Sequence, residues 1–199
     1  MLSLPSLFQA GALVLSFAAS LSQGASTDVV GTWSTGSGAV LTGTAFGNPV
    51  NNTFDYPPVA GYSYSFTEDG WYEEASFTWT SNATDHHCIQ ANIIWQHGTY
   101  KVNANGTITT DSTMFAGDGR VQVQNACAAQ SSAIYYYQEN NLFATWAVST
   151  WRGKTMLRLG SYDGSLLPRM YKISDTPRDY MFDSLYLSNH TDSSTTRRR

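Results

Sequence analysis

The chain has 199 residues, a net charge of −4 and only 13% charged residues, whereas aromatic residues make up 14%. Removing the three arginines at 197–199 leaves −7 on the remainder, which argues against nucleic acid as a partner, because phosphate backbones attract basic surfaces. The length fits one domain with a substantial core better than it fits two.

Residues 7–21 form an apolar stretch that small residues follow. The stretch is too short to cross a bilayer comfortably and is typical of a secretory signal peptide, although it lacks a basic start. A buried N-terminal helix is the alternative. We predict a signal peptide over residues 1–24, a folded lumenal domain over 25–187 and a disordered polar tail over 188–199.

A Gly-Thr-Trp motif at residues 31–33 is the first compact apolar motif after the leader. A glycine two residues before a tryptophan on the first strand is similar to the start of lipocalin-type (calycin) barrels, in which the indole closes one end. In such barrels a late arginine covers the ring, and Arg158 is the candidate here. We therefore predict a barrel plug of Trp33 and Arg158, stabilised by about 0.5–2 kcal/mol if the pair is shielded.

The clearest strand covers residues 71–80, where Trp71, Ala75, Phe77 and Trp79 alternate with polar residues and make one apolar face. Shorter alternating runs lie at residues 62–66, 93–95, 100–102, 121–123, 135–137 and 142–148. Asn-Gly and Asp-Gly turn signals separate several of them. We predict an all-β fold, an antiparallel up-and-down, lipocalin- or calycin-like barrel of about 8–10 strands, with a sandwich as the alternative.

Only two cysteines occur, Cys88 and Cys127. In a secreted protein their pairing is the natural expectation, with free buried thiols as the alternative. Closing this loop would stabilise the fold by about 4 kcal/mol in the chain-entropy model. We predict one disulfide.

Four Asn-x-Ser/Thr sequons begin at Asn51, Asn82, Asn105 and Asn189. Together with a signal peptide they predict N-glycosylation, and chance occurrence in an Asn- and Thr-rich chain is the alternative. Asn105 is favoured further, because an Asn-Gly pair between strands forms an exposed turn.

The sequence Asp85-His86-His87-Cys88 is the signature of membrane palmitoyltransferases. Those enzymes need several spanning helices and a cysteine-rich zinc domain, and the chain has neither. In an extended segment the two histidines point to opposite faces, so they cannot share a metal without a turn. We interpret the motif as a polar loop leading into a disulfide and predict no metal site.

Glu73 and Glu74 could suggest a glycosidase acid/base pair, but neighbouring residues of a strand diverge to opposite sides. Trp71, Trp79 and Trp95 could form a sugar platform or line a ligand cavity, and core packing on the inner face of a barrel is the simpler interpretation. Phosphate loops, dinucleotide fingerprints and nucleophile elbows do not occur. We predict no catalytic residue, no cofactor and no enzyme activity.

Longer motifs point to a family. They are the segments at residues 28–43, 54–58, 65–75, 92–98 and 167–171 together with the Ser/Thr-rich tail. Read together, they resemble the fungal reversal-of-TOR-lethality proteins, which are chaperones of the endoplasmic reticulum.

The resemblance implies a glycosylated, non-enzymatic lumenal chaperone in the endoplasmic reticulum that assists the folding of secretory and cell-wall proteins. Its partners would be unfolded clients and other lumenal folding factors, and its loss would lower cell-wall β-1,6-glucan. Family members are single-pass type I membrane proteins, so we expect membrane association only through a C-terminal helix that this chain lacks after Arg199. The alternative is a lipocalin-like binder of a small apolar ligand or glycan.

Overall fold

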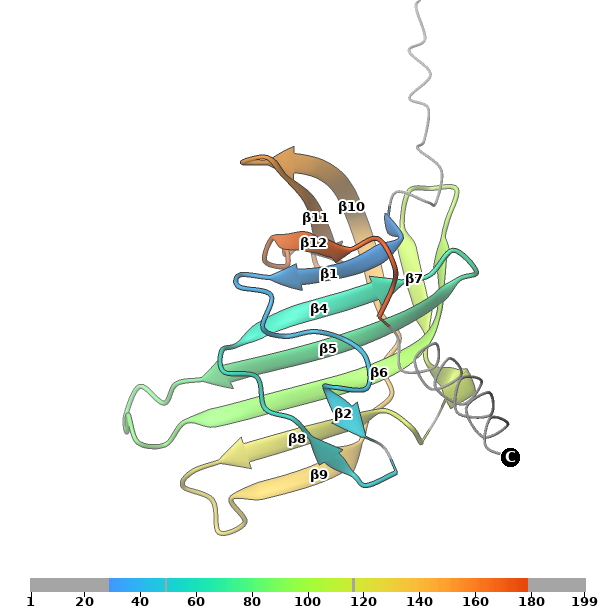
Figure 1. Ribbon diagram of the computed structural model, residues 1–199. Helices are drawn as coiled ribbons and strands as arrows, with labels where there is room; N and C mark the ends of the chain where they lie inside the picture. The colour runs from blue at the N-terminus through green and yellow to red at the C-terminus, as the bar shows by residue number, and fades with distance from the viewer. Residues whose placement is uncertain (1–28, 49, 116, 179–199) are drawn as a thin grey trace, which may run out of the picture.

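The computed structural model describes residues 29–48, 50–115 and 117–178, so the predicted signal peptide, the predicted tail and Asn189 lie outside the described residues. The described chain is built from strands and turns (Figure 1). The strands are β1 (Gly31–Thr35), β2 (Gly47–Asn48), β3 (Thr53–Phe54), β4 (Gly61–Phe66), β5 (Trp71–Thr80), β6 (Gln90–Val102), β7 (Ile108–Asp111), β8 (Arg120–Asn125), β9 (Ser132–Tyr136), β10 (Leu142–Trp151), β11 (Lys154–Ser161) and β12 (Met170–Ser174), with one 3-10 turn, η2 (Thr113–Phe115).

Ten strands form one antiparallel sheet in the order β5-β4-β1-β12-β11-β10-β7-β6-β8-β9, and β5 also pairs with β6. The extra pairing closes eight strands into a ring that follows the chain: β1, β4, β5, β6, β7, β10, β11 and β12. The all-β, up-and-down barrel prediction is therefore confirmed, with two excursions that the strand pattern did not separate from the ring.

The first excursion covers residues 36–60 and contains the small β2–β3 sheet. The second is the β8–β9 hairpin, which continues the sheet beyond the ring (Figure 1). It can do so because β6 is 13 residues long: residues 90–95 pair with β8, and residues 99–102 pair with β7.

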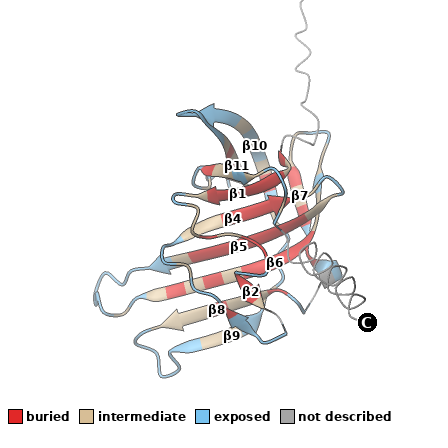
Figure 2. Ribbon diagram, viewed as in Figure 1, coloured by how far each residue is buried: buried red, intermediate tan, exposed pale blue. Residues whose placement is uncertain are grey.

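The ring encloses an inner core, defined here as the buried side chains around Trp33. Each strand of the ring except β6 contributes a member, and β6 adds the partly buried Tyr100 and Val102. The fully buried members include Trp33, Phe66, Tyr72, Ile108, Leu157, Leu159 and Met170. Strands β1, β4 and β5 are buried along most of their length, whereas β9 and β10 are largely exposed (Figure 2). The barrel interior is thus filled by side chains.

A second, outer core lies on the opposite face of β5 and β6. Ala75, Phe77, Ile93 and Trp95 point outward from the ring and pack against Val40, Phe46 and Phe54 of the first excursion. The apolar face that we expected to line the barrel is therefore its outer face. The alternation of β5 was recognised correctly, but the excursion covers this side, and Tyr72 and Glu74 face inward instead.

Gly31 explains why a glycine precedes the first tryptophan. Its φ is +122°, and a Cβ at this position would lie 2.6 Å from the backbone oxygen of Ser174. Any other residue would strain the backbone at this positive φ, and its Cβ would clash with the Ser174 oxygen. The glycine lets β1 pack closely against the end of β12.

Candidate functional site

Trp33 lies at the start of the ring with its indole fully buried, and its Nε1 donates a hydrogen bond of 2.6 Å to the backbone oxygen of Val29. The cation over its ring is Lys172, whose Nζ lies 5.2 Å from the ring centroid. Lys172 faces Trp33 directly in the β1–β12 register. Arg158 lies between two inner-core leucines of β11, so the strand's alternation directs it to the other face. The structure therefore places Lys172, not Arg158, over the ring.

Glu73 is a fully buried carboxylate on the outer face of β5. Its Oε1 accepts hydrogen bonds from the Gly43 backbone N at 2.5 Å and from the Trp95 Nε1 at 2.8 Å. Gly43 belongs to the first excursion and Trp95 to β6. The carboxylate thus fastens the excursion to the barrel wall.

Glu74 is buried on the inner face of the same strand. Its Oε1 accepts a hydrogen bond from the Tyr64 hydroxyl at 2.9 Å, and its Oε2 accepts from Gln96 at 2.8 Å and from Asn141 at 3.0 Å. Burial raises the pKa of this carboxyl, and the three hydrogen bonds act against that shift. Glu74 therefore joins β4, β5, β6 and the segment that leads into β10.

The two glutamates point to opposite faces of β5, as the sequence predicted, and each is occupied by structural hydrogen bonds. They do not form a facing pair of carboxylates that could act on one glycosidic bond. The three tryptophans do not form one platform either. Trp95 is buried in the outer core, while Trp71 and Trp79 lie at opposite ends of β5, about 26 Å apart along an extended strand.

His97 lies on β6 opposite Glu73, with its ring edge against Trp95 at 5.1 Å between centroids. Burial lowers its pKa to about 4, although Asp118, 3.6 Å from its Nε2, acts in the opposite direction. The imidazole is therefore neutral at neutral pH. This residue was not predicted from the sequence, because a lone histidine in an apolar strand carries no distinctive spacing.

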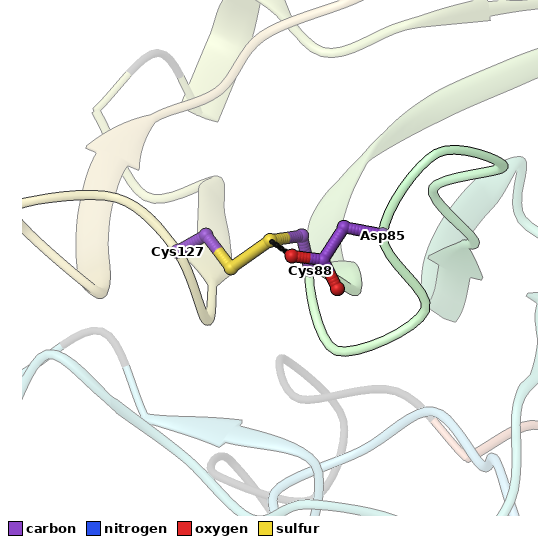
Figure 3. Close-up of side chains that lie close together, drawn as sticks. All are labelled: Asp85, Cys88 and Cys127. Carbon is purple, nitrogen blue, oxygen red and sulfur yellow. Dashed lines mark hydrogen bonds between the residues drawn. A yellow bond between two sulfur atoms is a disulfide. The ribbon is translucent and has the colours of Figure 1, made fainter.

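Cys88 and Cys127 form the predicted disulfide, which spans 39 residues and has a Cα–Cα distance of 5.2 Å (Figure 3). It joins the β5–β6 loop to the β8–β9 loop. The bridge lies beside the pair formed by Gln90, the first residue of β6, and Asn125, the last residue of β8. The Asp85 Oδ2 lies 3.3 Å from the Cys88 Sγ (Figure 3). The bridge anchors the open end of the second excursion to the ring.

The segment from Asp85 to Cys88 forms a turn, closed by a 3.0 Å hydrogen bond from the Cys88 backbone N to the Asp85 oxygen. The turn brings the rings of His86 and His87 to 3.8 Å between centroids, so they do not point to opposite faces as an extended segment would require. Ligand atoms of Asp85 and both histidines lie within 4.8 Å of one another. These exposed side chains could hold a divalent transition metal through two nitrogens and one oxygen.

Three of the four sequons lie within the described residues. Asn51, Asn82 and Asn105 are exposed, and each lies in or beside a turn. This exposure is what an oligosaccharide requires.

The hydroxyl groups that hold the first excursion were not predicted from the sequence. Thr32, Ser34, Ser63 and Ser65 occupy paired positions on the outer face of β1 and β4 and are buried. Their oxygens bond to the excursion or to one another: Ser34 Oγ donates to the Val40 oxygen, and Ser65 Oγ lies 2.6 Å from Thr42 Oγ1. The sequence did not indicate their burial, because serine and threonine residues at alternate strand positions are usually exposed.

Within the described part of the chain, no helix has the length and apolar character needed to cross a membrane. No solved structure matches the chain. A family model described as "Rot1: Chaperone for protein-folding within the ER, fungal" matches residues 29–199.

Curated relatives agree with this match. A "Protein rot1" of Botryotinia fuckeliana is 40% identical over 173 residues, which is 85% of this chain and 64% of the relative. The "Protein rot1" of Aspergillus clavatus is 39% identical over 76% of this chain and 64% of the relative. That of Schizosaccharomyces pombe is 37% identical over 78% and 62%. The chain thus covers less than two thirds of the length of these three relatives. It belongs to the fungal Rot1 family.

Proposed function

We propose that the protein is a non-enzymatic chaperone of the endoplasmic reticulum lumen that assists the folding of secretory and cell-wall proteins. The observation that carries this proposal is the family match over residues 29–199, which includes every described strand. The geometry agrees with it. The barrel interior is filled by side chains, and both buried glutamates serve as structural acceptors rather than facing a common cleft.

The test is suppression of aggregation by the purified chain without ATP. A reduced, unfolded secretory glycoprotein is diluted from denaturant, and light scattering is followed with and without an equimolar amount of the chain. We expect lower scattering with the chain than with an unrelated disulfide-bonded β-barrel of similar size. Equal scattering in the two samples would count against the proposal.

Entry into the secretory pathway supplies a second part of the proposal. We infer cleavage near residue 24 and glycans on Asn51, Asn82, Asn105 and Asn189, supported by the exposure of the first three. Mass spectrometry of the chain secreted by a fungal host, before and after an endoglycosidase, tests both points. An intact leader or an unshifted mass would contradict them.

The cell-wall role follows from client folding in this proposal. A fungal strain depleted of its own Rot1-family protein should recover wall β-1,6-glucan when it expresses this domain with a membrane anchor. A direct role in glucan turnover makes a different prediction, namely that Glu73→Gln and Glu74→Gln together abolish recovery even when the protein remains folded. Our proposal expects the folded double variant to restore glucan.

A further inference from the structure

The strand order of the ten-stranded sheet ends at β9, which is paired on one side alone among the described strands. At one end of the strand order β5 pairs with β6, which closes the ring. At the other end β9 pairs with β8 and with no other described strand (Figure 1). An edge strand presents unpaired N–H and C=O groups that can bond another chain.

Two hydrogen bonds at the ends of β9 reveal which of its main-chain groups face outward. The Asn125 backbone N donates to the Ser131 oxygen at 2.9 Å, and the Tyr137 backbone N donates to the Gly119 oxygen at 3.0 Å. Both pairs follow the β8–β9 register. They are therefore positions at which β9 bonds inward to β8.

Inward and outward bonding alternate along an antiparallel pair. Ala133 and Tyr135 accordingly bond to β8, like the residues just beyond each end of the strand. The N–H and C=O groups of Ser132, Ile134 and Tyr136 point out of the sheet. Three consecutive sets of donors and acceptors are thus presented at the spacing that an added strand requires.

The edge is not protected in the usual way. Natural edge strands are commonly blocked by lysine, proline or inward-pointing charges. Residues 121–138, which contain β9 and most of β8, include no charged residue and no proline. Tyr135 and Tyr136 are 56% and 75% exposed.

A hollow of about 440 Å³ lies beside β9. Its lining residues are Val50, Asn52, Arg120, Ile134, Tyr135 and Tyr136. The single charge, on Arg120, is engaged by Asn52 and lies 4.4 Å from the Tyr136 ring centroid. A strand added to β9 would direct alternate side chains to this side of the sheet, where Val50, Ile134 and the tyrosine rings offer aliphatic and aromatic contacts.

We propose that the open edge of β9 binds an extended, uncharged, apolar segment of an unfolded polypeptide by strand addition. This inference rests on the proposed chaperone function and names the site through which clients are held. Main-chain hydrogen bonds make such binding tolerant of sequence, and the aliphatic and aromatic residues of the hollow can contact large uncharged side chains of the client.

A pair of variants at Tyr136 isolates the contribution of its outward-facing backbone N–H. Tyr136→Pro removes the N–H that faces the open edge but no hydrogen bond to β8, whereas Tyr136→Ala removes the same side chain and keeps the N–H. The probe is a fluorescein-labelled octapeptide of alternating threonine and valine, and binding is followed by fluorescence anisotropy. We expect Tyr136→Pro to bind the peptide about three- to ten-fold more weakly than Tyr136→Ala. Equal affinities would overturn the proposal.

Amide hydrogen exchange of the wild-type chain gives a readout that needs no variant. In the free protein the amides of Ala133 and Tyr135 should exchange slowly and those of Ser132, Ile134 and Tyr136 rapidly. Saturating peptide should slow the second set. Absence of that change would overturn the proposal, as would slow exchange that depends on protein concentration without peptide, because a second copy would then occupy the edge.

The aggregation assay distinguishes failure of the edge proposal from failure of the chaperone proposal. If wild-type protein suppresses aggregation and Tyr136→Pro does so equally well, the edge proposal fails while the chaperone proposal stands. If wild-type protein binds the peptide at β9 but does not suppress aggregation, the chaperone proposal fails and the edge remains a peptide-binding site.

Discussion

Trp33 and Trp95 are both fully buried, yet they belong to cores that are closed in different ways. The inner core around Trp33 is enclosed by the strands of the ring, so the hydrogen bonds that define the barrel also define the core. The outer core around Trp95 lies outside the ring and is covered by the irregular excursion at residues 36–60. That cover is held by polar contacts, mainly to Glu73 and to the hydroxyl groups of β1 and β4.

The difference indicates how stability is distributed in this molecule. Opening the inner core requires breaking the ring, whereas the outer core can open when one segment detaches. Changes in the first should therefore reduce global stability, and changes in the second should also appear as local exposure of the excursion.

The largest effect is expected from Trp33→Ala. The indole fills the inner core and is surrounded by side chains from several strands, so its loss should reduce the free energy of unfolding by about 3–5 kcal/mol. Trp79→Ala is the matched control, because that side chain is 54% exposed. Urea denaturation followed by circular dichroism measures both, and similar losses for the two variants would break the proposed contrast.

His97 should make the outer core sensitive to acid. Its pKa falls from 6.5 to about 4 on folding, so the unfolded state binds a proton in this interval and the folded state does not. Stability contributed by this group should therefore decline as the pH falls from 6.5 towards 4, by up to about 3 kcal/mol. Urea denaturation at several pH values should show a shallower decline for His97→Gln, and parallel profiles would contradict the assignment.

Glu73→Met should detach the excursion while leaving the ring closed. The change leaves the Gly43 N–H and the Trp95 Nε1–H without the carboxylate acceptor, at a cost of about 1–3 kcal/mol. Glu73→Gln keeps a neutral acceptor and should cost less. Limited proteolysis between residues 36 and 60 is the measurement, and cleavage should be faster in Glu73→Met than in Glu73→Gln. Equal cleavage rates would argue that the Glu73 hydrogen bonds do not hold the excursion against the barrel.

The smallest effect concerns the cation over Trp33. Lys172→Ala should lower the free energy of unfolding by about 0.5–1 kcal/mol, because the ammonium lies over the indole at a partly exposed site. Arg158→Ala is the control and should change stability less. Thermal unfolding of the two variants shows which of the two cations stabilises the fold. A larger loss of stability for Arg158→Ala would indicate that Arg158, and not Lys172, covers Trp33.

The prediction of strands succeeded where alternation is clear, because alternation is a local property that each segment carries by itself. It did not include β7, β11 or β12, and it treated residues 93–95 and 100–102, which both lie in β6, as separate runs. Residues 71–80 read as a strand whether or not their partner is known. The prediction was wrong where the role of a residue depends on its contacts with another segment of the chain. Glu73 interrupts the apolar face of β5 because the excursion supplies it with a donor, and Lys172 replaces Arg158 over Trp33 because the β1–β12 register places it there.

The all-β class, the antiparallel up-and-down arrangement and, with only two cysteines, the disulfide could be predicted from the sequence. These features depend on local periodicity, turn residues and the count of thiols. The folded molecule was needed to show which face of β5 points inward, how the Asp85–Cys88 turn gathers two histidines, and that β9 is paired on one side alone. Each of those results depends on contacts between segments distant in the chain or on a backbone turn, and residue spacing alone does not encode them.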